Sequence, residues 1–183
     1  MKFNVLKKSI AIILLILFMV CVVSCVNAEN SEDSEISMLT LSKGGIVMNY
    51  PSTWGYSEAT SQYAIMAISK LDSIDSFGVG QVNILIEKKP VEGEFYSYVN
   101  STYQKMQKDS SFQLISSGGV MIGTIDGVEY IYTSDQNGTV KEHKAVWFEK
   151  GGQAYVLLYS APTDKFEENL YVFDYILSDI QIA

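Results

Sequence analysis

Apolar residues follow two spacings along the chain, one typical of strands and one typical of helices. Val82, Ile84 and Ile86 fall at every second position, which predicts a strand with one buried face. Turn-forming residues bound further strand-like stretches on both sides of it. The predicted strands are Met38 to Ser42, Gly45 to Tyr50, Tyr63 to Ser69, Gly80 to Glu87, Phe112 to Thr124, Val128 to Ser134, Thr139 to Lys150 and Gln153 to Ser160.

Two longer stretches repeat at three- and four-residue spacings instead. One is Glu92 to Lys108, with a stripe that begins at Phe95, and the other is Asp164 to Leu177, with a stripe that begins at Phe166. Both are predicted to be amphipathic helices. Two helices among antiparallel strands predict an α+β domain.

Glycine pairs indicate where the hairpins turn. Asp126-Gly127 and Asn137-Gly138 have the composition of type I′ turns, in which both central residues need a positive φ. Gly151-Gly152 is a third candidate, and Gly118-Gly119 is expected to interrupt the strand that begins at Phe112. These turns predict a meander in the second half of the chain.

The chain begins with a secretory signal. A short basic segment, residues 1–8, precedes the uncharged apolar run from Ile10 to Val23. A spanning helix needs about 20 apolar residues, so cleavage or lipid anchoring is the expected fate of this run. We assign residues 1–28 to a signal peptide or lipoprotein signal.

Two processing sites overlap at the end of this signal. The run from Val22 to Cys25 resembles a lipobox, which makes Cys25 the expected site of lipid attachment. Cleavage after Ala28 is the alternative, and it would release a freely secreted protein. Two acyl chains are needed for stable anchoring. The expected location is therefore the outer face of the cytoplasmic membrane, with secretion as the alternative.

Residues 29–38 follow as a linker, because they are polar, acidic and nearly free of apolar side chains. Apolar residues are dense from Leu39 to Ala183, where we find no internal repeat. One domain, 39–183, is therefore expected. Neither processing route leaves a cysteine pair for a disulfide in it, so its core must supply the stability.

Three segments of the sequence resemble those of the PsbP-like family: GIVMNYPSTW near the start, TIDGVEYIYT in the middle, and AVWFEKGGQAYVLLYSAPTDKF before the last helix. The resemblance implies a three-layer α/β/α arrangement, with an antiparallel sheet between helical layers. It is closest to the exported, lipoprotein-type members of prokaryotes and archaea, which look like binding modules. The ion-retaining role of the photosynthetic member is not carried over, because no ion-handling residue matches.

Charge narrows the classes of partner. All 13 basic residues are lysines, and the 21 acidic residues give a net charge of −8. Three of the lysines lie in the leader, so the rest of the chain is still more acidic. Such a surface repels phosphate backbones and anionic headgroups, which excludes nucleic acid and leaves the N-terminal anchor as the expected membrane contact.

The inventory of reactive side chains is small. His143 is the only histidine, and its charged neighbours predict a solvated surface position. Both cysteines lie in the signal, so the domain has no thiol. The sequence also contains no nucleophile elbow and no phosphate-binding loop, so we expect no enzyme. The nearest acidic pairs are Asp72 with Asp75, Asp126 with Glu129, and Glu167 with Glu168.

Those pairs lack the ligand spacing of a calcium loop, so an acidic solvated face is expected and no cofactor is assigned. Two alternatives remain open. One is a small hydrolase that uses an acidic pair, and the other is a protein that binds a solute or a divalent metal such as calcium.

Tyrosine is abundant, and four tyrosines fall partly off the apolar stripes of the helices: Tyr96, Tyr103, Tyr171 and Tyr175. Exposed tyrosine is enriched at protein contacts, so these four are a candidate contact surface for an envelope protein or a small solute. Trp54 and Trp147 are predicted to be core residues. Asn100 and Asn137 begin glycosylation sequons, which matter only in a host that glycosylates exported proteins.

Overall fold

The computed structural model describes residues 36–183, apart from 58–60, 92 and 137. The unit discussed below is Ile36–Ala183, and the leader, Cys25, most of the acidic linker and Asn137 lie outside the described residues. No helix in the described part of the chain is long and apolar enough to cross a membrane.

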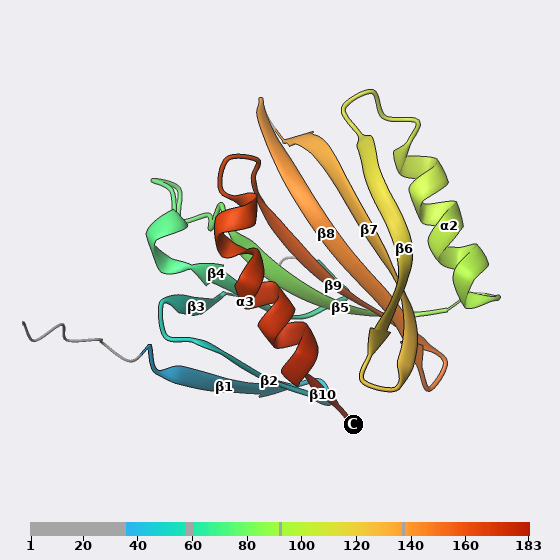
Figure 1. Cartoon of the computed structure of the whole chain (residues 1–183), viewed down its shortest axis with the longest axis horizontal. Coiled ribbons are helices and arrows are strands. Elements are labelled where there is room, and N and C mark those ends of the chain that lie inside the picture. The colour runs from blue at the N-terminus through green and yellow to red at the C-terminus, as the bar shows by residue number, and fades with distance from the viewer. Residues whose placement is uncertain (1–35, 58–60, 92, 137) are drawn as a thin grey trace, which may run out of the picture. The chain divides into compact units, whose positions relative to one another are not determined.

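Seven antiparallel strands form the large sheet, in the order β3-β4-β5-β9-β8-β7-β6 (Figure 1). Strand β9 is inserted between β5 and β8, so it joins the first three strands to the last three. The strands are β3 (Trp54–Ser57), β4 (Ala64–Lys70), β5 (Asn83–Pro90), β6 (Gln113–Ile122), β7 (Ile125–Gln136), β8 (Thr139–Lys150) and β9 (Gln153–Pro162).

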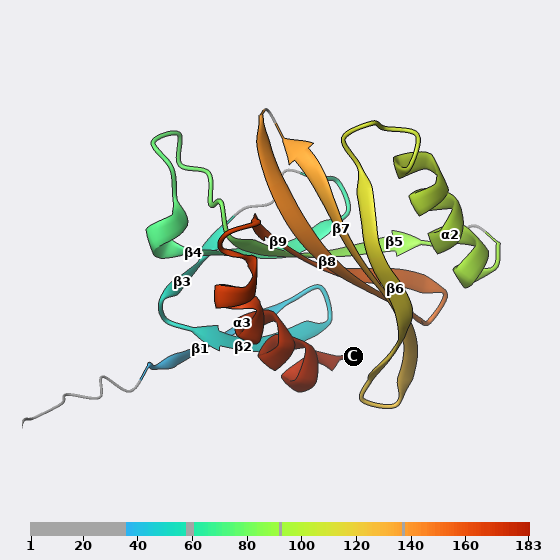
Figure 2. The same cartoon turned by 45° about the horizontal axis from the view of Figure 1, so that its top comes forward.

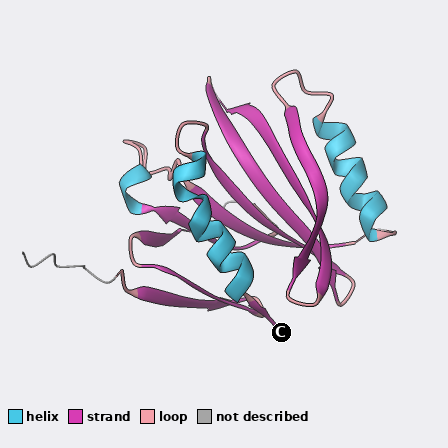
Figure 3. Cartoon of the chain, viewed as in Figure 1, coloured by secondary structure: helices cyan, strands magenta, loops and turns pink. Residues whose placement is uncertain are grey.

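A small antiparallel sheet has β2 (Ile46–Pro51) at its centre, between β1 (Met38–Lys43) and β10 (Gln181–Ile182). The helices are α2 (Phe95–Met106) and α3 (Phe166–Asp179), and a short 3₁₀ turn, η2 (Leu71–Ser73), follows β4. Figure 3 shows α2, α3 and the 3₁₀ turn in cyan beside the magenta strands, which make up most of the described chain. The two predicted helices and the hairpin turn at Gly151-Gly152 are confirmed. The predicted turn at Asn137-Gly138 includes Asn137, which lies outside the described residues.

One face of the large sheet packs against α3 and the small sheet. Strand residues at alternate positions, such as Ile84, Ile86 and Leu157, are fully buried there beneath Phe173 and Ile176 of α3. Full burial of each such side chain contributes about 1.5–3 kcal/mol. The alternating apolar residues that predicted one buried face on β5 therefore lie in this core.

The opposite face packs against α2, whose buried side chains are Phe95, Val99 and Tyr103. These contact Tyr130 and Trp147 on the neighbouring strands. Figure 2 shows the strands of the large sheet between the two helices. The predicted α+β fold, with an antiparallel sheet flanked by helices in three layers, is confirmed.

The start of α2 shows why the acidic residues lie there. Glu94 is the N-cap, and its carboxylate accepts hydrogen bonds from the backbone N–H groups of Tyr96 (3.0 Å) and Ser97 (2.6 Å). These bonds lower the pKa of Glu94, the Ser97 N–H having the largest effect. The helix begins one residue later, at Phe95, rather than at Glu92.

The predicted turn at Asp126-Gly127 is wrong. Both residues lie inside β7, paired with Met121 and Val120, and the chain turns instead at Gly123, whose φ is +59°. Gly127 is needed for a different reason, because a Cβ there would lie 2.6 Å from the carbonyl oxygen of Trp147.

The expected break at Gly118-Gly119 is also wrong. Strand β6 is continuous through both glycines, and it forms one edge of the large sheet. A Cβ on either glycine would meet no atom within 4 Å. Extended strand geometry needs no glycine here, so the pair does not end the strand.

Candidate binding site

Buried polar side chains gather at one end of the face that carries α2. Besides Asn169 on α3, the buried polar or charged residues in the described part of the chain are Ser69, Lys141, His143 and Ser160. They come from β8 and β9, which form one hairpin, and from β4, which is far from both in sequence. Buried polar groups are costly unless they are satisfied, and every buried side-chain nitrogen and oxygen of the described residues has a hydrogen-bond partner.

Strand register explains the cluster. Ser69 lies opposite Asn83, Asn83 lies opposite Ser160, and Ser160 lies opposite His143. Directly paired residues point to the same face of a sheet, so these four side chains form a polar row across β4, β5, β9 and β8.

The ring of His143 is held on both sides. Its Nε2 is 2.9 Å from Ser134 Oγ and its Nδ1 is 2.8 Å from Ser160 Oγ, while the ring of Tyr132 stacks against it at 4.7 Å. The predicted solvated position is wrong, because His143 is only 3% exposed.

Alternation along β8 accounts for this error. The charged neighbour Lys144 points to the other face, where it forms ion pairs with Glu129 at 3.2 Å and Asp174 of α3 at 3.0 Å. His143 points to the α2 side instead and stacks on Tyr132. Neighbouring residues of this charged stretch therefore lie on opposite faces of the sheet, Lys144 beside α3 and His143 on the α2 side.

Burial, with a smaller contribution from the charge of Lys141, lowers the pKa of His143 to about 4. The imidazole is therefore neutral near pH 7. A neutral ring has one N–H and one acceptor nitrogen, so it donates to one serine and accepts from the other. This network satisfies both ring nitrogens, and Ser160 itself is buried.

A loop from Leu71 to Val82, hereafter the 71–82 loop, connects β4 to β5 near the end of this row. The Asp75 carboxylate holds it together. Oδ1 accepts the N–H groups of Phe77 (2.9 Å) and Val79 (3.0 Å), and Oδ2 accepts Gln81 Nε2 at 2.7 Å. The Val79 N–H is the largest cause of the lowered pKa of Asp75, so this carboxylate is ionised near neutral pH.

Two hollows flank the 71–82 loop. The first, about 520 Å³, has Ser69 and Asn83 of the polar row in its lining, together with the apolar Ala67 and Leu85. We call it the Ser69 hollow. The second, about 700 Å³, is lined by Lys141, Thr139 and residues of the loop, and we call it the Lys141 hollow. Val79 lines both.

The loop between the hollows exposes apolar side chains. These are Leu71, Ile74, Phe77 and Val79, and Phe77 is 90% exposed. A single exposed apolar residue is ordinary, but four within one short loop form a patch of the kind found at interaction sites. The sequence showed turn-forming residues here and gave no sign that the apolar ones would face solvent.

The predicted tyrosine surface is not one surface. Tyr96 on α2 is exposed, as are Tyr171 and Tyr175 on α3, but the two helices lie on opposite faces of the large sheet. Tyr103 is only 3% exposed: it stacks on Tyr130 at 3.6 Å, and its hydroxyl accepts the Trp147 Nε1–H at 2.9 Å. Its helical position faces the sheet, so its assignment to a contact surface is wrong. Trp54 and Trp147 are buried, as predicted.

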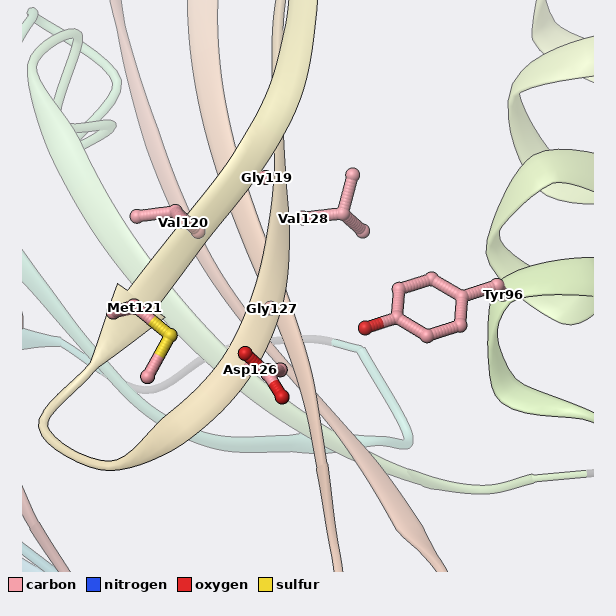
Figure 4. Close-up of a pocket in the computed structure, with 7 residues that line it drawn as sticks. All are labelled: Tyr96, Gly119, Val120, Met121, Asp126, Gly127 and Val128. Atoms are coloured by element: carbon pink, nitrogen blue, oxygen red, sulfur yellow. The ribbon is translucent and has the colours of Figure 1, made fainter.

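Tyr96 lines a separate hollow of about 440 Å³ beside the β6–β7 hairpin (Figure 4). Its ring projects from α2 toward the strand that carries Asp126 and Val128, and Gly119 and Gly127 contribute backbone. This hollow holds few polar side chains. The two hollows beside the 71–82 loop, which adjoin buried polar residues, are therefore the stronger candidate.

The acidic pairs do not converge on a common point. Asp72 forms an ion pair with Lys70 (3.3 Å), Glu129 pairs with Lys144, and Glu168 pairs with Lys165 at 3.1 Å. Within the described residues, no group of three or more His, Cys, Asp or Glu side chains is placed to hold a metal ion.

Asn100 is exposed on α2, and its Oδ1 accepts a hydrogen bond from the Tyr130 hydroxyl at 2.8 Å. Use of this sequon, and of the one at Asn137, stays a prediction. The hydrogen bond from Tyr130 gives Asn100 a structural role as well, because it connects α2 to β7.

Solved structures similar to this chain share its fold. Cyanobacterial PsbP (CyanoP) from Synechocystis sp. PCC 6803 matches with a TM-score of 0.59 at 14% identity, over 81% of this chain and 94% of CyanoP. LpqN of Mycobacterium tuberculosis, described as involved in cell envelope biogenesis, matches with a TM-score of 0.57 at 15% identity, over 81% of this chain and 92% of LpqN.

A Pseudomonas aeruginosa protein of unknown function, described as a putative regulator, gives a TM-score of 0.51 at 12% identity, over 77% of this chain and 94% of its own. No family model matches the sequence, and no curated protein matches it. At these identities the likeness is one of fold.

Proposed function

From the PsbP-like fold of this chain, we propose that it is a non-enzymatic binding module of the cell envelope, and that it binds its ligand at the 71–82 loop. The two hollows beside that loop form the binding surface. The ligand is a small solute or an exposed segment of an envelope protein.

The exposed apolar loop is the observation that carries this proposal. Phe77 and Val79 stay in solvent although their backbone N–H groups are fixed by Asp75. A fixed backbone presents these side chains without a large ordering cost when a ligand arrives, which is what preorganisation contributes to affinity. The hollows on either side supply concave apolar and polar surface beside them.

An envelope location is supported by the sequence and by one neighbour. The basic and apolar leader, with Cys25 at its end, has the pattern of an exported lipoprotein. LpqN, which has a similar fold, is described as involved in cell envelope biogenesis. Lipid attachment at Cys25 would tether the module to the outer face of the cytoplasmic membrane.

The absence of catalysis is part of the proposal, and two observations support it. Of the two serines bonded to His143, Ser160 is buried, so a substrate would have poor access to its hydroxyl, and Ser134 is half-buried. The acidic side chains Asp72, Glu129 and Glu168 pair with lysines rather than with one another. A hydrolase would need a converging acid and base in an open pocket.

A thermal-shift screen of solutes and short peptides tests the proposal. A ligand at 100 times its dissociation constant adds about 2.7 kcal/mol to stability, which is a readily measured shift. Phe77→Ser should abolish the shift, whereas Tyr171→Ser, an exposed aromatic on α3, should retain it. A ligand whose shift survives Phe77→Ser would place the binding site elsewhere and refute the proposal.

A further inference from the structure

Lys141 has a largely buried side chain whose ammonium makes neither an ion pair nor a hydrogen bond with the described residues. It is only 6% exposed, and among the residues that the structure describes no carboxylate lies within 4.0 Å of its ammonium and no hydrogen bond reaches it. Lys144, on the other face of the same strand, makes two ion pairs. Among the described residues no buried side-chain nitrogen or oxygen lacks a hydrogen-bond partner, so the ammonium of Lys141 reaches solvent although most of its side chain is buried. Water can be displaced from such an ammonium by an anionic ligand.

Register places Lys141 at the end of the polar row. It lies opposite Ser134 on β7 and Pro162 on β9, and it follows the same face of β8 as His143. The Lys141 hollow opens beside it, with Thr139 also in the lining. The three donors of the ammonium are therefore available to a molecule in that hollow.

Asp75 lines the same hollow but does not neutralise Lys141 directly. Its two oxygens are occupied by Phe77, Val79 and Gln81, all within the loop. Burial lowers the pKa of Lys141 and the charge of Asp75 only partly opposes this effect. Asp75 contributes a negative field at the hollow without using the donors of Lys141.

The remaining lining defines what could bind. Phe77, Val79 and Pro162 give an apolar wall, and Thr139 adds a hydroxyl. Gln81 uses its Nε2 on Asp75 and on the carbonyl of Val79, so it offers no free donor. The Lys141 hollow thus combines one cation, one hydroxyl and apolar surface with the Asp75 carboxylate and the Gln81 amide, which hydrogen-bond within the loop.

We propose that the Lys141 hollow binds a monocarboxylate with an apolar substituent, its carboxylate on the ammonium of Lys141 and its apolar part against Phe77 and Val79. One lysine balances one negative charge, and the nearby Asp75 disfavours a dianion such as a phosphate monoester. The proposal rests on the proposed function, because it names the ligand class of that surface.

A free organic acid and a peptide that ends in an apolar residue both present this chemistry. Calorimetric titration of the full-length protein with hexanoate, and with a tripeptide ending in phenylalanine, separates the two sources. The amidated tripeptide and inorganic phosphate are the matched negative probes. We expect one of the two carboxylates to bind at least about tenfold more tightly than either negative probe.

Variants connect this binding to Lys141. Lys141→Met and Lys141→Gln should each weaken carboxylate binding about tenfold or more, since both remove the charge. Lys108→Met, at an exposed lysine beyond α2, should bind like the wild type. Without ligand, Lys141→Met should melt at a higher temperature than the wild type, because a desolvated charge has been replaced by an apolar chain.

Each result decides between the two proposals. Carboxylate binding that is unchanged in Lys141→Met and Lys141→Gln, or phosphate binding as tight as carboxylate binding, would overturn the assignment. If both carboxylates fail to bind but another ligand gives a shift that depends on Phe77, the assignment is overturned and the proposed function stands. If neither carboxylate binds and no ligand of the screen gives a shift that depends on Phe77, both the assignment and the proposed function fail.

Discussion

His143 on β8 and Ser160 on β9 lie directly opposite one another, and Nδ1 of the histidine is 2.8 Å from Oγ of the serine. Together with Ser134 on the other side of the ring, this contact ties three neighbouring strands through one buried imidazole. The two contacts join residues 9 and 17 positions apart on consecutive strands, and they form only when these strands have paired in register.

The first prediction concerns pH and His143. The folded-state pKa of about 4 lies below the unfolded value of 6.5, so the unfolded chain binds the proton first as pH falls. The free energy of unfolding should therefore be highest above pH 6.5 and should lose about 3 kcal/mol between pH 6.5 and pH 4 from this group.

Urea denaturation at a series of pH values measures this loss. His143→Gln, which does not titrate, is the control, because the carboxylates that also titrate are common to both proteins. Subtracting one pH profile from the other isolates the histidine. Parallel profiles for the two proteins across this window would contradict a neutral, buried His143.

The second prediction concerns the bond between Trp147 and Tyr103. Tyr103→Phe removes the oxygen that accepts the indole N–H at 2.9 Å, and it leaves a buried donor without a partner. The free energy of unfolding should fall by about 1–3 kcal/mol. Tyr96→Phe, on the exposed side of the same helix, should be close to neutral in the same urea titration.

The third prediction contrasts two glycines on paired strands. In Gly127→Ala the new methyl group would lie 2.6 Å from the carbonyl oxygen of Trp147, so the backbones of β7 and β8 must separate. A loss of about 2 kcal/mol or more is expected. Gly118→Ala meets no atom within 4 Å and should be neutral or slightly stabilising, as measured by thermal melting.

The fourth prediction concerns the rigidity of the 71–82 loop. Asp75→Ala removes the acceptor of three loop hydrogen bonds, so the amides of Phe77 and Val79 should exchange with solvent about tenfold faster or more. Hydrogen exchange followed by NMR reports on both amides. Asp72→Ala, at an exposed carboxylate paired with Lys70, should leave their exchange rates unchanged.

The sequence predicts the elements well wherever burial follows a simple period. The stripe that begins at Phe95 predicted α2, and Gly151-Gly152 marked the β8–β9 turn, where both glycines have positive φ. The short strand β3 was missed, because four residues after a proline give no periodic signal. A sequence also does not reveal which of two glycine-containing segments turns, and here Gly123 does so rather than Gly127.

The candidate site was beyond the reach of the sequence for a physical reason. The burial of His143 and Lys141 depends on which face of β8 packs against which layer, and strand register decides that. A period of two shows that alternate residues share a face, but it does not show which face is covered. The exposure of Phe77 likewise follows from the bonds of Asp75, which exist only in the folded loop.

The place of β9 in the large sheet also governs the order of events during synthesis. Strands β3 to β5 and β6 to β8 leave the ribosome first, yet the two groups have no hydrogen-bonded contact until β9 is made between them. Non-local pairing of this kind is slow to form. The large sheet therefore cannot close during synthesis until β9 has emerged and paired on both of its sides.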